Sequence, residues 1–132
     1  MSLLGIDIGT TGTKAIAFNE DGDILASDYK EYNLVFPKPG WVEFDTKDQW
    51  QKIFEVLKKV NSDPKVKKDP VTAISVSTFG EGLTPIDKNG NIIHNTLYST
   101  DARSIRELEE VLEIYSRRDL FQITGYPPGF IC

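Results

Sequence analysis

The residues best suited to chemistry lie near the start of the chain, where a short turn joins two apolar runs. Asp7 stands at the end of the first run and Lys14 at the start of the second, and the turn between them contains Gly9, Thr10, Thr11, Gly12 and Thr13. An unpaired carboxylate is costly to bury, so Asp7 is expected at a sheet edge that faces a ligand. Glycines at positive φ would bring the turn close to that ligand, and the threonine hydroxyls would add donors to the turn amides.

Such a concave row of donors suits phosphate oxygens. A carboxylate beside phosphates is explained if a divalent cation lies between them, because hard cations take oxygen ligands from both. The turn is not a Walker loop, since it lacks the gap before the Gly-Lys pair and leads into a predicted strand, Ala15–Phe18, instead of a helix. The turn residues alone are equally compatible with an ordinary hairpin.

The elements that position this turn begin with an Asp-Gly hairpin signal at residues 21 and 22, followed by an extended run, Ile24–Tyr32. Three sequential antiparallel strands are therefore expected. The segment Phe36–Asp45 contains two prolines and a glycine, which exclude a helix and favour an extended, turning path. Trp41 and Phe44 are expected to anchor this segment to the core, and stacking of Trp41 on a substrate is the alternative.

A helix is predicted over residues 46–60. Thr46–Gln49 has the capping-box pattern, and one helical face carries Trp50, Ile53, Phe54, Leu57 and Val60. A polar loop over residues 61–70, including the basic Lys65–Lys68, is expected to follow. Val71–Thr78 is short, rich in β-branched residues and free of charge, as expected of a strand covered on both faces. This order of elements indicates a mixed α/β sheet.

Two more apolar runs, 83–86 and 92–98, flank an Asn-Gly turn at 87–90 and predict another hairpin, with His94 in a solvent-facing structural role. A second capping box, Ser104–Glu107, predicts a helix capped by Asp101 or Ser104. Arg117–Asp119 is expected to close that helix, and residues 124–130 to continue as a loop. The apolar face of this helix comprises Ile105, Leu108, Val111, Leu112 and Tyr115.

Length and composition restrict the function classes. With 132 residues, 39% of them hydrophobic, the chain is expected to be a single domain with its own core. The net charge of −5 argues against a nucleic-acid partner. There is no run that predicts a membrane span or a secretory signal. Cys132 is the only cysteine, which excludes an intrachain disulfide or a cysteine metal site, so a cytoplasmic location is the default expectation.

Four stretches together resemble the FGGY family of carbohydrate kinases, which includes xylulose, gluconate, glycerol, ribulose and fuculose kinases. The stretches, in the family's order, are Asp7–Lys14, Pro39–Glu43, Ile74–Glu81 and Asp101–Arg103. The first alone is similar to the wider actin, hexokinase and Hsp70 group, while Pro-Gly-Trp-Val-Glu narrows the resemblance to these kinases. The resemblance covers nearly the whole chain and implies an α/β, ribonuclease-H-like fold, with residues 1–132 as the opening part of the family's first domain.

The resemblance also implies roles for single residues. Asp7 matches the acid that organises Mg²⁺, and Lys14 stands in the place of a basic residue near the phosphates of ATP. The phosphate loop, residues 7–14, includes the ATP-contacting positions Gly9, Thr10, Thr11, Gly12 and Thr13. On the sugar side, loops 79–82 and 99–103 carry Glu81 and Asp101, which match positions for substrate binding. The expected product is a sugar or polyol phosphate.

The sequence departs from the family pattern at two places. Ser99 stands where many members have tryptophan, and Phe79-Gly80 replaces the Gln-Met or Gln-Arg pair of xylulose and glycerol kinases, so neither substrate is favoured. The family's base, an aspartate, is expected beyond Cys132, as is the second ATP-binding domain. The isolated chain is therefore expected to be inactive. A homodimer is compatible with this interpretation, and a non-catalytic nucleotide- or partner-binding module of actin/Hsp70-like fold is the alternative function.

Overall fold

The computed structural model describes residues 1–80 and 82–129, and these residues belong to two compact units. The first unit contains residues 1–33 and 45–80, and the second contains residues 34–44 and the described residues from 82 onward. Chain length alone had suggested one domain. The segments that form the two units are interleaved along the chain.

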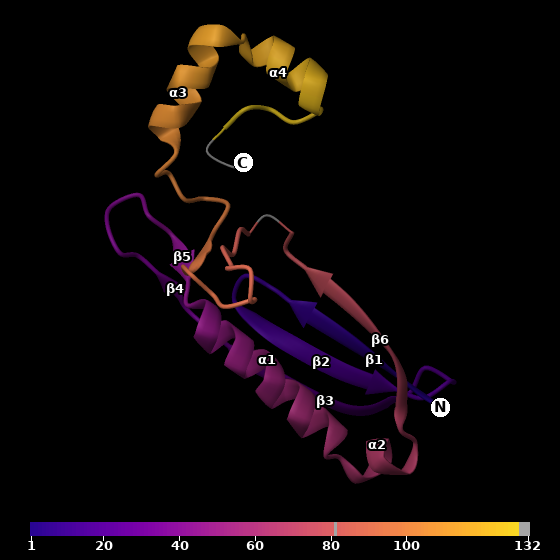
Figure 1. The fold of residues 1–132 in the computed structure, drawn as a ribbon. Coiled ribbons are helices and arrows are strands. Elements are labelled where there is room, and N and C mark those ends of the chain that lie inside the picture. Colours follow the sequence, from indigo (N-terminus) through magenta and orange to yellow (C-terminus); the bar gives the residue numbers. More distant parts are fainter. Residues whose placement is uncertain (81, 130–132) are drawn as a thin grey trace. The chain divides into compact units, whose positions relative to one another are not determined.

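The first unit is built on a four-stranded mixed sheet (Figure 1). Strands β1 (Ser2–Ile8), β2 (Gly12–Phe18) and β3 (Ile24–Glu31) pair antiparallel in sequence order. Strand β6 (Val71–Thr78) pairs parallel with β1, so the order is β3-β2-β1-β6. The predicted antiparallel strands and mixed α/β sheet are confirmed.

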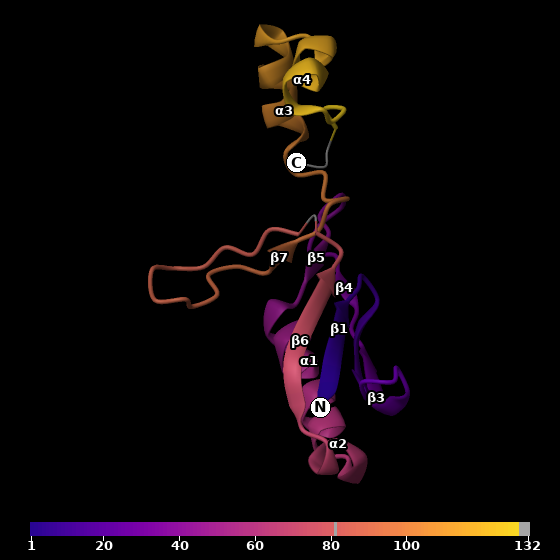
Figure 2. The ribbon, with the colours of Figure 1, turned by 90° about the vertical axis from the view of Figure 1, so that its right-hand side faces the viewer.

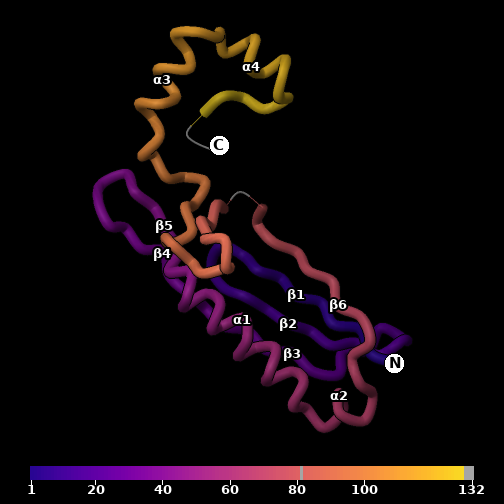
Figure 3. Tube along the Cα trace, viewed as in Figure 1, coloured from indigo at the N-terminus to yellow at the C-terminus, as the bar shows by residue number. Residues whose placement is uncertain are grey.

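Helix α1 (Thr46–Asn61) covers one face of this sheet and packs on β2 and β3, as the ribbon and the Cα trace show (Figures 1 and 3). Alternate residues of the strands face the helix because side chains change sides at each step along a strand. The core that results is aliphatic and comprises Leu4, Ile6, Ala15, Ala17, Val56, Val60 and Val66. Full burial of a Val, Leu or Ile side chain contributes about 1.5–3 kcal/mol, so this core is the main source of stability in the unit.

Two details of α1 differ from the prediction. The N-cap is Asp45, whose carboxylate accepts hydrogen bonds from the N–H groups of Lys47 and Asp48, so the capping-box assignment of Thr46 was one residue late. The predicted apolar face was also displaced. Trp50 and Phe54 are more than half exposed and contact each other edge to face at 5.3 Å. The helix instead buries Gln49, Ile53, Val56 and Val60.

The polar segment predicted as a loop contains a short helix, α2 (Pro64–Lys68). Asp63 caps it by accepting from the N–H of Lys65, and proline at the first helical position needs no hydrogen bond there. Val66 is buried in the core, so this basic segment is not simply a solvated loop.

Strand β6 forms as predicted, but its coverage differs. It lies at the edge of the sheet, and in Figure 2 the first unit is seen from the side on which β6 lies. Ile74 is 61% exposed and Val76 58%, so the expectation of a strand covered on both faces is wrong for the described chain. The reason is that α1 packs on β2 and β3, away from this edge.

The second unit contains a small antiparallel sheet of β4 (Leu34–Val35), β5 (Glu43–Phe44) and β7 (Thr96–Leu97), in the order β4-β5-β7. The predicted hairpin over residues 83–98 is held by isolated bridges, Leu83 with Leu97 and Ile86 with Ile92. Its regular strand is shorter than predicted because Pro85 and the turn residues interrupt the pairing.

Two helices follow, α3 (Ile105–Ile114) and α4 (Arg117–Thr124). Ser104 precedes α3 without a side-chain capping bond, and Tyr115 lies outside the helix. Residues 117–119 were predicted to close α3. They begin α4 instead, because the Ser116 hydroxyl accepts from the N–H of Asp119 and starts a new helix. In the part of the chain that the structure describes, no helix has the length and apolar character needed to cross a bilayer.

Candidate nucleotide-phosphate site

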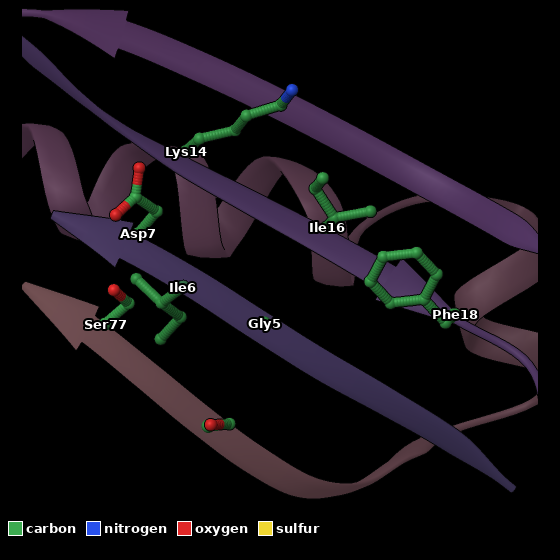
Figure 4. A pocket seen from close by; sticks show the side chains of 8 residues that line it. Gly5, Ile6, Asp7, Lys14, Ile16, Phe18 and Ser77 are labelled. Carbon is green, nitrogen blue, oxygen red and sulfur yellow. The ribbon is translucent and has the colours of Figure 1, made fainter. Parts of the chain in front are cut away.

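Three polar side chains lie in a row across the first unit's sheet, on the face away from α1 (Figure 4). Asp7, next to last in β1, is paired in antiparallel register with Lys14 of β2 and in parallel register with Ser77 of β6. Adjacent strands are about 4.8 Å apart, and paired residues point to the same face. The strands therefore place a hydroxyl, a carboxylate and an ammonium side by side.

These side chains line an open hollow of about 240 Å³. Its other end is apolar, with Ile16 and Phe18 of β2 beside Gly5 of β1. Figure 4 shows the carboxylate of Asp7 and the hydroxyl of Ser77 near the carboxyl ends of their strands, with the Lys14 side chain extending away from Asp7. One end of the hollow is thus charged and the other end is apolar.

Asp7 and Lys14 are both exposed, and no ion pair within 4.0 Å joins them. Among the described residues the Asp7 carboxylate also accepts no hydrogen bond. A carboxylate and an ammonium on adjacent strands gain little from pairing in water, so each remains available to a ligand. Asp7 was expected at a sheet edge that faces a ligand. It lies instead on an inner strand, next to the strand's carboxyl end, and its side chain is exposed.

The turn between β1 and β2 is closed by the N–H of Gly9 donating to the carbonyl of Gly12 at 2.9 Å. Neither glycine has positive φ, so the predicted reason for their presence is wrong. A Cβ on Gly12 would lie 2.5 Å from the carbonyl oxygen of Lys30 and 2.6 Å from the hydroxyl of Tyr29. Gly12 is therefore required by close packing against β3.

The threonines of the turn differ from one another. Thr13 is fully buried, and its hydroxyl donates to the carbonyl of Asp7 at 3.1 Å, which ties the end of β1 to the start of β2. Within the described chain, Thr10 and Thr11 have no partner for their N–H groups or hydroxyls. Donors that the chain itself leaves unpaired are what a phosphate site requires.

Tyr32 supports this turn and was not singled out by the sequence. Its hydroxyl donates to the carbonyl of Gly9 at 2.5 Å and lies 3.1 Å from that of Gly12, while its N–H donates to the carbonyl of Thr11. Burial raises the pKa of the Tyr32 phenol, so the group remains a neutral donor. A tyrosine at the end of the third strand gives no local signal of this role, because the contact spans more than twenty residues.

The donor set fits Mg²⁺ in one particular way. The described residues contain no group of three or more His, Cys, Asp or Glu side chains that could enclose a metal ion. Mg²⁺ does not need one, since it keeps several waters and binds through one or two carboxylates together with substrate phosphates. Asp7 beside the open turn suits a cation that arrives with a nucleotide.

In the second unit, by contrast, two carboxylates are buried and hydrogen-bonded. Asp101 is 6% exposed, and its oxygens accept hydrogen bonds from the N–H of Val42 and from three N–H groups of Arg103, at 2.7–2.9 Å. Glu43 is 3% exposed and accepts from Arg103 at 2.6 Å and from Asn95 at 3.0 Å. Arg103 therefore bridges two buried acids through charge-assisted bonds.

The electrostatics of this cluster follow from those contacts. Burial raises the pKa of Glu43, but hydrogen bonds from Arg103 and Asn95 outweigh it and the pKa lies below its usual value. The same balance of burial against the bonds from Arg103 lowers the pKa of Asp101. The hydrogen bond to Asp101 raises the pKa of Arg103. Both acids are held ionised.

Trp41 completes the cluster. The Arg103 guanidinium lies over its ring at 3.9 Å from the centroid, and the ammonium of Lys38 lies at 4.5 Å. The ring is half-buried and held by cations, while Phe44 is fully buried and contacts Tyr98 edge to face. His94 is half-exposed, with Nε2 3.8 Å from Glu43.

Of the two predicted substrate residues, the structure describes only Asp101. Glu81 lies outside the described residues. Asp101 caps no helix, and its acceptors are engaged within the unit, which assigns it a structural contact that spacing alone could not indicate. Its role toward a substrate stays a prediction.

Comparison with known proteins supplies the family. The model for the N-terminal domain of the FGGY family of carbohydrate kinases matches residues 2–129. The chain belongs to this FGGY family. Glycerol kinase 2 of Streptomyces coelicolor is 36% identical over 126 residues, which cover 95% of this chain and 25% of that protein.

Solved structures show the same FGGY fold. A xylulose kinase from Rhodospirillum rubrum superposes with a TM-score of 0.83 at 23% identity, covering 92% of this chain and 25% of that one. Plasmodium falciparum glycerol kinase with ADP gives 0.80 at 24% identity, covering 98% of this chain and 26% of that one. The predicted ribonuclease-H-like α/β fold is confirmed. The chain spans about a quarter of the length of the relatives it matches.

Proposed function

We propose that this chain is the opening part of an ATP-dependent kinase that transfers the γ-phosphate of ATP to a hydroxyl of a sugar or polyol. Membership in the FGGY family supports the reaction class. The observation that carries the proposal is Asp7, exposed and without a partner, in register with Lys14 and next to a turn with open amide donors.

Phosphoryl transfer needs alignment and charge neutralisation more than covalent chemistry by the protein. Thr10 and Thr11 would donate to phosphate oxygens, and Lys14 would place a positive charge beside them. Asp7 would hold Mg²⁺, which neutralises phosphate charge when bound. Gly9, Gly12 and Thr13 shape the turn from within, and Tyr32 holds it.

The acceptor hydroxyl must lose a proton, and no residue of the chain is proposed as that base. We keep the family's aspartate, beyond Cys132, as the base. Glu81 is the proposed substrate contact. Asp101 is the other proposed residue of the substrate side. Its bonds to Arg103 would hold the segment 99–103 in place. Glycerol and ketoses define the substrate class to be tested, since relatives carry the names glycerol kinase and xylulose kinase.

We also propose that the full-length parent protein is cytoplasmic and forms a homodimer. Light scattering of the purified full-length parent protein measures its oligomeric state. A monomer at micromolar concentration would refute the homodimer and leave the kinase function untouched.

The decisive experiment uses the full-length parent protein and measures ADP formation from ATP and Mg²⁺ with a panel of polyols and sugars. Acceptor-dependent ADP formation is expected. Asp7→Asn is expected to lower kcat by about a hundredfold or more, as loss of a transition-state electrostatic contact does. Asp21→Asn makes the same charge change at an exposed turn and is the matched control.

ATP consumption that ignores every acceptor, or an Asp7→Asn variant with normal kcat, would contradict the proposal. If nucleotide changes only the affinity for a protein partner, the alternative module of actin/Hsp70-like fold is correct. The isolated 132-residue chain is expected to form no ADP above the Asp7→Asn background.

A further inference from the structure

Ser77 occupies a position that the phosphate-site roles leave unused. It is the parallel-register partner of Asp7 and lines the same hollow. Within the described residues its hydroxyl makes no hydrogen bond, although a serine hydroxyl can bond to its own or neighbouring backbone groups. Figure 4 shows the hydroxyl beside the carboxyl end of β1, near Asp7.

Lys14 and Ser77 flank Asp7 on opposite sides, because β1 lies between β2 and β6. The β2 side of Asp7 therefore presents a cation, which suits phosphate. The β6 side presents a neutral oxygen donor, which suits a metal ion or the water that it carries. A hard divalent cation takes hydroxyl and water oxygens together with carboxylates.

We propose that Ser77 is a positioning residue of the cation site, with its hydroxyl as the second oxygen that holds the hydrated divalent cation against Asp7. This inference rests on the proposed function, since the cation is expected to arrive with the nucleotide. The hydroxyl orients the cation from the β6 side, leaving the β2 side to the phosphates and Lys14.

The chain contains a matched control. Ser75 lines the same hollow on the same strand and is exposed like Ser77, but its register partner is Gly5. A serine-to-alanine change there removes the same hydroxyl without a neighbouring carboxylate. Any general effect of altering β6 appears in both variants, while an effect on the cation appears only at Ser77.

The test measures binding of Mn²⁺ to the full-length parent protein with ADP, using electron paramagnetic resonance to follow free Mn²⁺. Ser77→Ala is expected to weaken Mn²⁺ binding by about tenfold, as loss of an outer-shell contact does. Ser75→Ala and Ser77→Thr are expected to keep the wild-type Kd. ADP affinity in EDTA, measured by calorimetry, is expected to be unchanged in all three variants.

The outcomes separate the two proposals. If Asp7→Asn weakens Mn²⁺ binding while Ser77→Ala does not, the role of Ser77 is refuted and the kinase function stands. If Ser77→Ala weakens ADP binding equally in EDTA, the hydroxyl contacts phosphate and the cation role is refuted. If the wild-type parent binds no Mn²⁺ with ADP, both proposals fail.

Discussion

The first unit leaves the carboxylate of Asp7 exposed and unpartnered, whereas the second unit buries Asp101 and engages both of its oxygens. Both aspartates belong to stretches that resemble the same family, and the sequence made both of them candidate site residues. A carboxylate whose oxygens already accept hydrogen bonds is held in place by its own unit. A carboxylate without hydrogen-bond partners at a strand end can bind a ligand. The comparison separates a residue that maintains structure from one that is available for chemistry.

The units also differ in what holds them together. The aliphatic core lies wholly within the first unit. Among the described residues of the second unit, Phe44 is the one hydrophobic residue that is buried, and it lies beside the acids bridged by Arg103. Ionic contacts therefore carry a larger share of stability in the second unit.

The largest effect is expected from Arg103→Met, which leaves two buried acids without their cation. Removing one partner of a buried ion pair costs about 3–5 kcal/mol. The measurement is urea unfolding followed by Trp41 fluorescence in a Trp50→Phe background, since the two tryptophans lie in different units. Arg106→Met is the control. The Arg106 side chain is 85% exposed, and its ion pair with Glu110 stabilises the fold by about 0.5 kcal/mol at most. Similar losses for the two arginines would contradict the claim that the buried ion pairs of Arg103 carry a large share of the second unit's stability.

Acid is expected to weaken the second unit by a smaller amount, because protonated acids still hydrogen-bond to Arg103. The pKa values of Glu43 and Asp101 are lowered in the folded protein, so unfolding takes up protons as pH falls. Their contribution is complete at neutral pH and is lost as pH falls from about 4 through the folded values. Trp41 fluorescence is expected to change in this range before that of Trp50, measured in single-tryptophan variants. Coincident transitions would show that the cluster is not the acid-sensitive element.

The first unit is tested by Gly12→Ala, which would place a methyl group against the backbone of Lys30. Overpacking of this kind costs about 1–3 kcal/mol. Gly5→Ala is the matched control in the adjacent strand, since its nearest atom would be 4.0 Å away. Thermal unfolding followed by circular dichroism measures both, and an equal shift in Tm would refute the packing role of Gly12.

The smallest effect concerns helix caps. Asp45→Ala removes two capping bonds from α1 and is expected to cost about 1 kcal/mol. Ser104→Ala removes no side-chain cap from α3 and should stay within about 0.5 kcal/mol. Urea unfolding with Trp50 and Trp41 as separate reporters compares them. A larger loss at Ser104 would reverse the assignment of caps.

The sequence predicted β1, β2, β3, β6, α1 and the turn between β1 and β2, because their signals are local: alternation, helical periodicity and turn residues. Helix α2 was missed although Asp63-Pro64 is a helix-start signal, since its polar composition resembled a loop. The exposure of Trp50 depends on where the sheet ends, which helical periodicity does not encode.

The candidate site divides in the same way. Asp7, Lys14 and the turn were predicted, and register placed them together. The contact of Glu43 with Arg103 spans sixty residues, and that of Tyr32 with Gly9 twenty-three, so neither leaves a local pattern. The packing role of Gly12 depends on the neighbouring strand, which explains why positive φ was wrongly assigned.

The edge strand β6 has a practical consequence for anyone who prepares this chain by itself. It contains no charged residue, and within the described chain one of its two backbone edges is open to water. Natural edge strands usually carry a lysine, a proline or a bulge that discourages pairing with a neighbouring molecule. At high concentration, separate molecules are therefore expected to join through residues 71–78 into extended intermolecular sheets, and a lysine in place of Val76 would keep the preparation soluble.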